Sequence, residues 1–479
     1  MGTSLRVNTM ATKFRQQLRQ EAEQWWKDGW IDAEFYQRLS DRYQFTDIEP
    51  SASGRFVAIL LALGGVLLGL GVITFVAANW QAWPRSFRVL LLMGVFVCVN
   101  AGGFYLWRRP AHERGLQRLG HGLLLTGGLV LGANMALMSQ MFHQSGEAYE
   151  LYFVWGLGVA LMAYSLRLVS LGVLSWGLLA IGYGNWWLTD LFSTQVGWVA
   201  TAMGLVALIV CGLFVPLAYR CRSRVLFTLA GLGFAVSFTW GLLPASDSWP
   251  GLIPVALLLP PALLWVYDPA IWRFTPPIHA TRQLLRADLF QPIARSLTVW
   301  HLAIVLYAFS FNEIWPGLRE IVPNSFDGIG WYAELPIFAV LTGLGWLRLR
   351  HQLRGWSPLQ ERSVNTGAIA LILLLSAGLF CWHILATDIT IVATFFFNIM
   401  LFLLAIALLR DWLALGTRRT FWGGMSILII GLLTRLFEYN IDLMFKAFVL
   451  VLCGVCVIVT GLWFERHLQP ANPQRLPEG

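Results

Sequence analysis

Charged residues are scarce in this chain: only 13% of its 479 residues are charged, whereas 57% are apolar. Water-soluble proteins carry about a quarter charged residues and fewer than half apolar ones, so the composition excludes an ordinary soluble domain. The net charge of +8 does not indicate nucleic-acid binding, because the basic residues are scattered between apolar runs and form no patch.

Cysteine is also rare. The six cysteines lie within apolar runs or, for Cys221, in an arginine-rich connection, so no disulfide framework is expected. Cys453 and Cys456 have the spacing of a redox pair, but an apolar helix disfavours the thiolate and the pair is expected to be inert. The sequence contains no phosphate-binding glycine loop, His-Glu-x-x-His helix or Gly-x-Ser-x-Gly turn. These absences count against an enzyme with a familiar site, and the sequence predicts no cofactor and no metal.

Apolar runs long enough to cross a bilayer are abundant instead. The first, 56–78, has no charged residue and is followed at once by Asn79, Trp80 and Trp83, which suit the headgroup layer. A cleaved signal peptide has a shorter apolar stretch, so this run is expected to stay as the first crossing. The fourteen predicted crossings are 56–78, 87–107, 119–141, 149–166, 168–188, 196–219, 225–243, 252–267, 297–315, 331–349, 364–385, 389–409, 421–437 and 443–464.

Lysine and arginine fall mainly on one side of this topology. With a cytoplasmic amino terminus, the inner connections and the carboxyl tail hold 21 of the 34, the outer connections five and the amino-terminal segment eight. This asymmetry predicts an inner-membrane protein with both termini in the cytoplasm. Eleven acidic residues, among them Glu147, Glu334 and Glu438, fall on the outer side. They form a negative vestibule for cations, or they simply collect where basic residues are absent.

The predicted fold is an all-α, polytopic helical bundle with about fourteen transmembrane helices and a small helical hairpin before them. The predicted parts are a cytoplasmic hairpin in 1–55, a first bundle of about eight helices in 56–267, an amphipathic cytoplasmic connection in 268–296, a second bundle of about six helices in 297–465 and a cytoplasmic tail in 466–479.

The hairpin is predicted from alternating charges and aromatics over 12–45. Gly29 is placed to end its first helix, and Asp32 to open the second. Its aromatic side chains suit a protein partner, a second copy of the chain or the headgroup layer; the alternative is that they pack against one another.

Placing a polar side chain inside the bilayer costs free energy, so each such residue is a functional candidate. Asn100, Asn134 and Asn398 lie deep in their runs, whereas other polar residues cluster near the outer ends. The residues predicted to line one outward-facing polar cavity are Gln140, His143, Glu147, Arg435, Glu438 and Asn79.

Two pairs of residues in this set each have a functional and a structural interpretation. His143 and Glu147, four apart, are a proton-handling or metal-binding pair if they share a helix face, and ordinary loop residues if Gly146 interrupts the helix. Arg435 and Glu438, three apart, predict an ion pair on one helix face. That pair either fixes helix packing or takes part in transport or gating.

Small residues and one histidine add further expectations. Gly65 with Gly69 and Gly128 with Gly132 have the spacing that lets helices approach closely, which indicates packing within the bundle. His383 stands near Asp388 at an outer end, with little geometric constraint from the sequence.

Three ordered elements suggest a family. They are the Trp-Trp-Lys-Asp-Gly-Trp-Ile segment at 25–31, the crossing that ends Ala77-Ala78-Asn79-Trp80 with Pro84 and Arg88 after it, and Met138 to His143 leading to Trp155. Together they resemble a bacterial family of predicted membrane proteins catalogued as domain of unknown function 2157, over residues 12–190. The resemblance implies a polytopic bacterial inner-membrane protein and adds no chemistry.

The leading hypothesis is that the outward-facing cavity binds or transports a small solute or ion. One alternative is a non-catalytic membrane scaffold or sensor that acts through the amino-terminal hairpin. Another is an intramembrane enzyme acting on a lipid, which would need paired titratable groups in a groove open to the bilayer. The expected contacts are the lipid bilayer and a protein partner or a second copy through 12–45, without nucleic acid.

Overall fold

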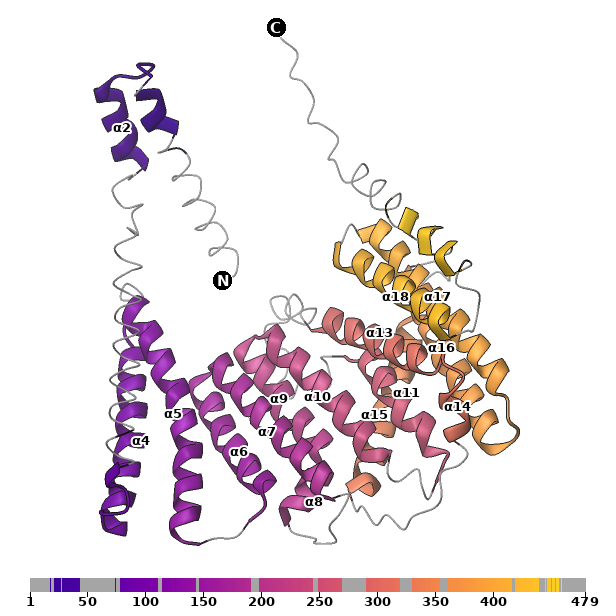
Figure 1. The fold of residues 1–479 in the computed structure, drawn as a ribbon, viewed down its shortest axis with the longest axis horizontal. Helices are drawn as coiled ribbons and strands as arrows, with labels where there is room; N and C mark the ends of the chain where they lie inside the picture. The colour runs from indigo at the N-terminus through magenta and orange to yellow at the C-terminus, as the bar shows by residue number, and fades with distance from the viewer. Residues whose placement is uncertain are drawn as a thin grey trace. The chain divides into compact units, whose positions relative to one another are not determined.

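The computed structural model of the chain is helical, and the residues it describes contain no strand (Figure 1). These residues are 18, 21–26, 28–43, 74, 78–110, 114–143, 146–190, 198–243, 249–268, 290–318, 330–353, 361–415, 418–438, 444, 446–448, 450–452, 454–455 and 458. The helices are α2 (Ala33–Tyr43), α4 (Arg85–Trp107), α5 (Arg114–Met141), α6 (Ala148–Leu166), α7 (Val169–Asp190), α8 (Trp198–Gly204), α9 (Val206–Cys221), α10 (Arg224–Leu242), α11 (Leu252–Trp265), α13 (Gln291–Ala308), α14 (Ile314–Gly317), α15 (Gly330–Leu353), α16 (Glu361–Leu385), α17 (Thr390–Leu415) and α18 (Arg418–Glu438). The predicted all-α class is confirmed.

Several predicted features lie outside the described residues. They are most of the first crossing, including Gly65 and Gly69, the greater part of the connection 268–296, the pair Cys453 and Cys456, and the tail 466–479.

Residues 1–92 form one compact unit. In its described amino-terminal part, Ala22 is fully buried, and Leu18, Trp25, Tyr36 and Leu39 pack against it. Trp25 and Tyr36 thus pack on a small apolar centre, whereas the side chains of Trp26, Trp30 and Phe35 are exposed, so the choice between packing and partner binding stays a prediction.

The turn in this segment has the predicted chemistry. Gly29 has φ 72°, the left-handed conformation that commonly ends a helix. The Asp32 carboxylate accepts the Phe35 N–H at 2.8 Å and so caps the start of α2. The hairpin as a whole stays a prediction, because residues 12–17 lie outside the described part.

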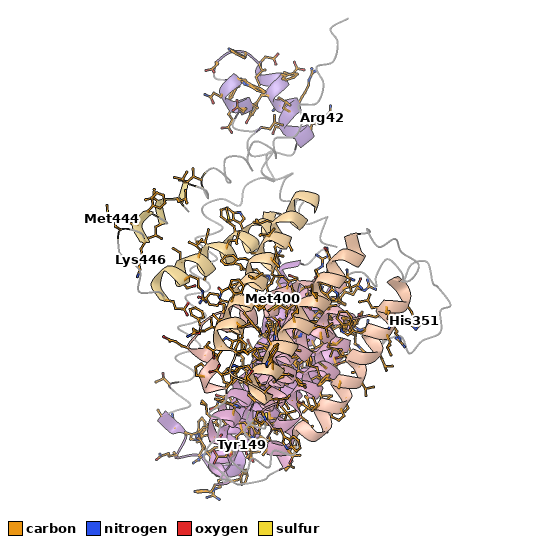
Figure 2. The ribbon with its side chains drawn as sticks, turned by 90° about the vertical axis from the view of Figure 1, so that its right-hand side faces the viewer. Arg42, Tyr149, His351, Met400, Met444 and Lys446 are labelled. Atoms are coloured by element: carbon orange, nitrogen blue, oxygen red, sulfur yellow. The ribbon has the colours of Figure 1, made fainter. Side chains whose placement is uncertain are left out.

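Residues 93–479 form the second unit, whose described helices pack around two apolar clusters. The first lies mainly among α6 to α11, and α15 contributes Phe338, whose ring lies 4.7 Å from that of Phe234. The second lies mainly among α13, α14, α16 and α17; Met400 is buried in it and lies among the packed helices in Figure 2. Because α15 packs against α8, α10 and α11, a later helix completes the earlier core. The predicted division into two bundles stays a prediction.

Six described helices are long and apolar enough to cross a membrane: α4, α5, α6, α10, α16 and α17. A seventh span results if α8 and α9, which are bent by 72°, are counted as one. The chain is therefore a multi-pass membrane protein. Other helices carry charges that lower their hydropathy, such as Arg295 in α13 and Glu334 in α15. The predicted total of fourteen crossings stays a prediction.

Two very short connections begin with arginines in the left-handed conformation. Arg167 has φ 55° and Arg222 has φ 50°, so each reverses the chain just after α6 or α9. Ser223 then accepts the Leu226 N–H and caps α10. The pairs α6–α7 and α9–α10 consequently pack as antiparallel neighbours.

Two adjacent prolines in α11 are accommodated by side chains of neighbouring helices. Pro260 and Pro261 lack the N–H groups that would bond to the carbonyls of Ala256 and Leu257. The Thr239 hydroxyl of α10 donates to Ala256 O at 2.9 Å. His301 Nε2 of α13 lies 3.0 Å from Leu257 O. Neighbouring side chains thus replace the missing backbone donors, as membrane helices require.

We expect His301→Leu to lower the free energy of unfolding by about 0.6–1.7 kcal/mol, because Leu257 O loses its donor inside the bundle. The cost should largely vanish in a Pro261→Ala background, where residue 261 regains the N–H that bonds to Leu257 O. SDS titration of the four combinations in detergent measures the coupling. Equal effects of His301→Leu in both backgrounds would show that His301 does not compensate for the missing N–H of Pro261.

Candidate functional site

The predicted residues Gln140, His143 and Glu147 lie around the connection between α5 and α6, and all three are exposed. Helix α5 ends at Met141, and His143 has φ 53°, so His143 and Glu147 do not share a helix face. This geometry agrees with the loop alternative. In the described part of the chain, no three histidine, cysteine or acidic side chains gather closely enough to hold a metal ion.

Arg435 and Glu438, near the end of α18, form the predicted ion pair. Each side chain is only 13% exposed. Arg435 also donates to the Ser310 hydroxyl and places its guanidinium 4.2 Å from the centre of the Phe311 ring. Glu438 accepts the Asn312 N–H at 3.2 Å. The pair therefore fastens α18 to the connection that follows α13.

Asn398 of α17 joins the same connection. Its amide donates to Ser310 O at 3.0 Å and to Thr394 O at 2.8 Å. The Ser310 hydroxyl in turn donates to Tyr307 O at 2.6 Å. Because these polar groups bond to one another at close range, the geometry favours the packing alternative for Arg435 and Glu438.

His383 of α16 is fully buried and holds the segment that contains α14. Its Nε2 lies 2.9 Å from Trp315 O, and its Nδ1 accepts the Ile389 N–H at 3.4 Å. Trp315 packs its ring against Phe380 and donates its indole N–H to Phe309 O at 2.8 Å. His383 is thus a structural histidine with both ring nitrogens engaged.

The structure brings together only part of the predicted cavity. Among the described residues, no hydrogen bond, ion pair or ring contact joins Arg435 or Glu438 to the α5–α6 connection. Helix α5 packs against α6 and α7, whereas α18 packs against α17. Asn79 belongs to the first unit, where its carbonyl accepts the Ala82 N–H at 3.0 Å. A single cavity lined by all six residues stays a prediction.

The sequence-based set does not include Glu334, which is the most informative carboxylate in the described bundle. The sequence places it on the outer side of the topology, and in the structure its side chain is only 5% exposed. Its Oε1 accepts the Leu208 N–H at 3.1 Å, from a residue 126 positions away. The neighbouring Ala207 N–H also lies near this carboxylate. A helix from late in the chain therefore places a buried acid at the start of α9.

Glu334 is held where a long apolar segment breaks. Helix α8 ends at Gly204, Leu205 lies outside both helices, and α9 leaves at 72° to α8. The first N–H groups of a helix have no partner within it, and Ala207 is fully buried from water. The Glu334 carboxylate supplies the acceptor and places negative charge at the positive end of the helix dipole.

The neighbours of Glu334 come from two further helices. Tyr183 of α7 and Cys211 of α9 both lie close enough to interact electrostatically with the carboxylate. Tyr183 donates its hydroxyl to Ser237 O of α10 at 3.1 Å. One turn beyond Glu334, Phe338 packs on Phe234. The acid therefore lies between an apolar cluster and a small set of polar groups.

The comparisons with known proteins support the membrane assignment. Residues 23–172 match the family described as "Predicted membrane protein (DUF2157)", which confirms the resemblance drawn from 12–190. No curated protein and no solved structure matches the chain.

Proposed function

We propose that the chain binds a small anion at the break between α8 and α9 and moves it across the membrane together with a proton carried by Glu334. The observation that supports this function is the buried Glu334 carboxylate on the Leu208 N–H at the start of α9. Broken helices inside a membrane occur where backbone lines a cavity or is buried in protein, and in transporters their amino-terminal ends face anionic groups of the substrate.

The proposed mechanism is a competition for one helix end. The amino terminus of α9 favours an anion through its free N–H groups and its dipole. In the resting arrangement the Glu334 carboxylate is that anion. A proton on Glu334 removes its charge and weakens its bond to Leu208, because hydrogen bonds to ionised acceptors are the stronger ones. A carboxylate of a substrate can then take the vacated position. When Glu334 releases the proton, its carboxylate can bond to the Leu208 N–H again.

We also propose a bacterial inner-membrane location with both termini in the cytoplasm. The distribution of lysine and arginine supports this orientation. Glu334 lies in the first turns of α15, the end of that helix assigned to the outer side. In this orientation, Glu334 would exchange protons with the periplasm and not with the cytoplasm.

Transport of a carboxylate by proteoliposomes tests this function. We expect the wild-type chain to take up radiolabelled succinate or glutamate faster than empty liposomes do when the outside is acidic. Glu334→Gln should reduce this uptake at least tenfold and remove its dependence on the pH gradient, because the amide keeps an acceptor for Leu208 but cannot release a proton.

Glu313→Gln is the matched control, because Glu313 is exposed beside α14. Choline uptake controls for leakage, and deletion of residues 1–50 should leave transport intact. If the deletion alone abolishes function, the scaffold or sensor hypothesis is favoured. Wild-type liposomes that accumulate neither acid, or folded Glu334→Gln that transports normally, would disprove the proposal.

A further inference from the structure

A second feature of the bundle is a cavity of about 270 Å³ where α11 ends, α13 begins and α15 approaches its end. Its lining residues include Arg295, Arg348, Gln291 and Asp268. Two basic residues and one acidic residue therefore belong to this lining. The lysine and arginine distribution places these helix ends on the cytoplasmic side.

Trp265, which also lines the cavity, gives an independent indication of a ligand. It is 7% exposed, and its buried indole N–H has no acceptor among the described residues. Most buried donors are paired, so an orphaned one calls for an explanation. The Arg295 guanidinium lies 5.3 Å from the centre of the same ring, a cation–π arrangement that holds this arginine beside the cavity.

We propose that this cavity binds a phosphate ester, through Arg295 and Arg348 and with Trp265 donating its indole N–H. Arginine recognises phosphate oxygens by paired, charge-assisted hydrogen bonds. The volume is close to the lower end of ligand pockets, roughly 300–1,000 Å³, which suits a headgroup-sized ligand. Basic pockets between helices on the cytoplasmic side are typical sites for lipid headgroups.

The wall of the cavity indicates that the phosphate is carried by a lipid. Leu344 lines the cavity and is 52% exposed, and Leu347, one turn along α15, is 55% exposed. Apolar surface thus continues from the cavity along the outside of α15, where acyl chains can lie. Next to Leu344, Gly345 packs so closely on Val266 that a β-carbon at 345 would displace it, and both residues line the cavity.

Lipid titration of the purified full-length chain tests this site, which does not depend on the proposed transport. In neutral detergent, binding of short-chain phosphatidylglycerol is followed by native mass spectrometry and by tryptophan fluorescence. We expect Arg295→Gln and Arg348→Gln each to weaken binding about tenfold or more, as loss of a charged hydrogen bond does. Trp265→Phe, which keeps an aromatic ring but removes the indole N–H, should weaken it several-fold.

Arg350→Gln is the matched control, because Arg350 is exposed on α15 two positions from Arg348 and outside the cavity; it should bind as the wild type does. Diacylglycerol, which lacks the phosphate, should not bind. Glycerol 1-phosphate tests for a water-soluble ligand. If it binds and phosphatidylglycerol does not, the cavity is a phosphate-ester site but its ligand is not a lipid. Failure of both phosphate esters, or equal affinity in the Arg295, Arg348 and Arg350 variants at unchanged thermal stability, would overturn the site.

Discussion

Replacing Arg435 by leucine is expected to lower the free energy of unfolding by about 3–5 kcal/mol, the largest stability effect foreseen in this chain. The reason is that Glu438, only 13% exposed, would keep its charge without its partner. Ser310 would also lose the donor that fastens α18 to the connection after α13. Breaking one side of a buried pair is more harmful than removing both sides, because the remaining charge stays away from water.

A double-mutant cycle separates this effect from simple loss of packing. Arg435→Leu with Glu438→Leu should recover most of the loss, since the pair is replaced by apolar side chains. SDS titration followed by circular dichroism gives the free energies. Arg38→Leu is the control for a surface pair with Glu34, where both side chains are more than 70% exposed, and should change stability by less than about 1 kcal/mol. Additive single effects of the Arg435 and Glu438 substitutions would show that the pair is not coupled.

Gly132→Ala is expected to lower the free energy of unfolding by about 1–3 kcal/mol. A β-carbon at residue 132 would overlap the indole ring of Trp155, so the ring must move. That movement breaks the hydrogen bond from Trp155 Nε1 to Gly128 O, which is 2.7 Å long. These losses exceed the gain of about 1 kcal/mol that alanine brings to a helix interior.

The control lies on the same helix. Gly122 of α5 has open space around the position of its missing β-carbon, so Gly122→Ala should be neutral or stabilising by up to about 1 kcal/mol. Thermal unfolding and tryptophan fluorescence of both variants measure the difference. If Gly122→Ala and Gly132→Ala change the free energy of unfolding equally, the close contact with Trp155 contributes nothing to stability.

Local spacing predicted a large part of these features. The four-residue spacing of Gly128 and Gly132 indicated close packing. The indole ring of Trp155 lies against Gly132 and donates to Gly128 O. The three-residue spacing of Arg435 and Glu438 indicated an ion pair, which is present. Such features are accessible from the sequence because helical geometry alone brings the residues onto one face.

Partners far apart in the chain left no such signal. Nothing near Arg435 indicates that Ser310 accepts from it, and nothing in the apolar run 196–219 indicates a break at Leu205. The distribution of lysine and arginine places Glu334 on the outer side but carries no information on whether its side chain is buried. Its burial follows from the packing of α15 against α8 and α10, which hydropathy does not encode.

The bond between Glu334 and Leu208 has a consequence for assembly. The two residues are 126 positions apart, so the ribosome has delivered α8 and α9 to the translocon long before α15 exists. During that interval the exposed amides of the break must bond to water, to lipid headgroups or to the insertion machinery. Insertion of α15 would then complete the earlier half of the bundle. A chain truncated before residue 330 lacks Glu334, so we expect it not to complete this half.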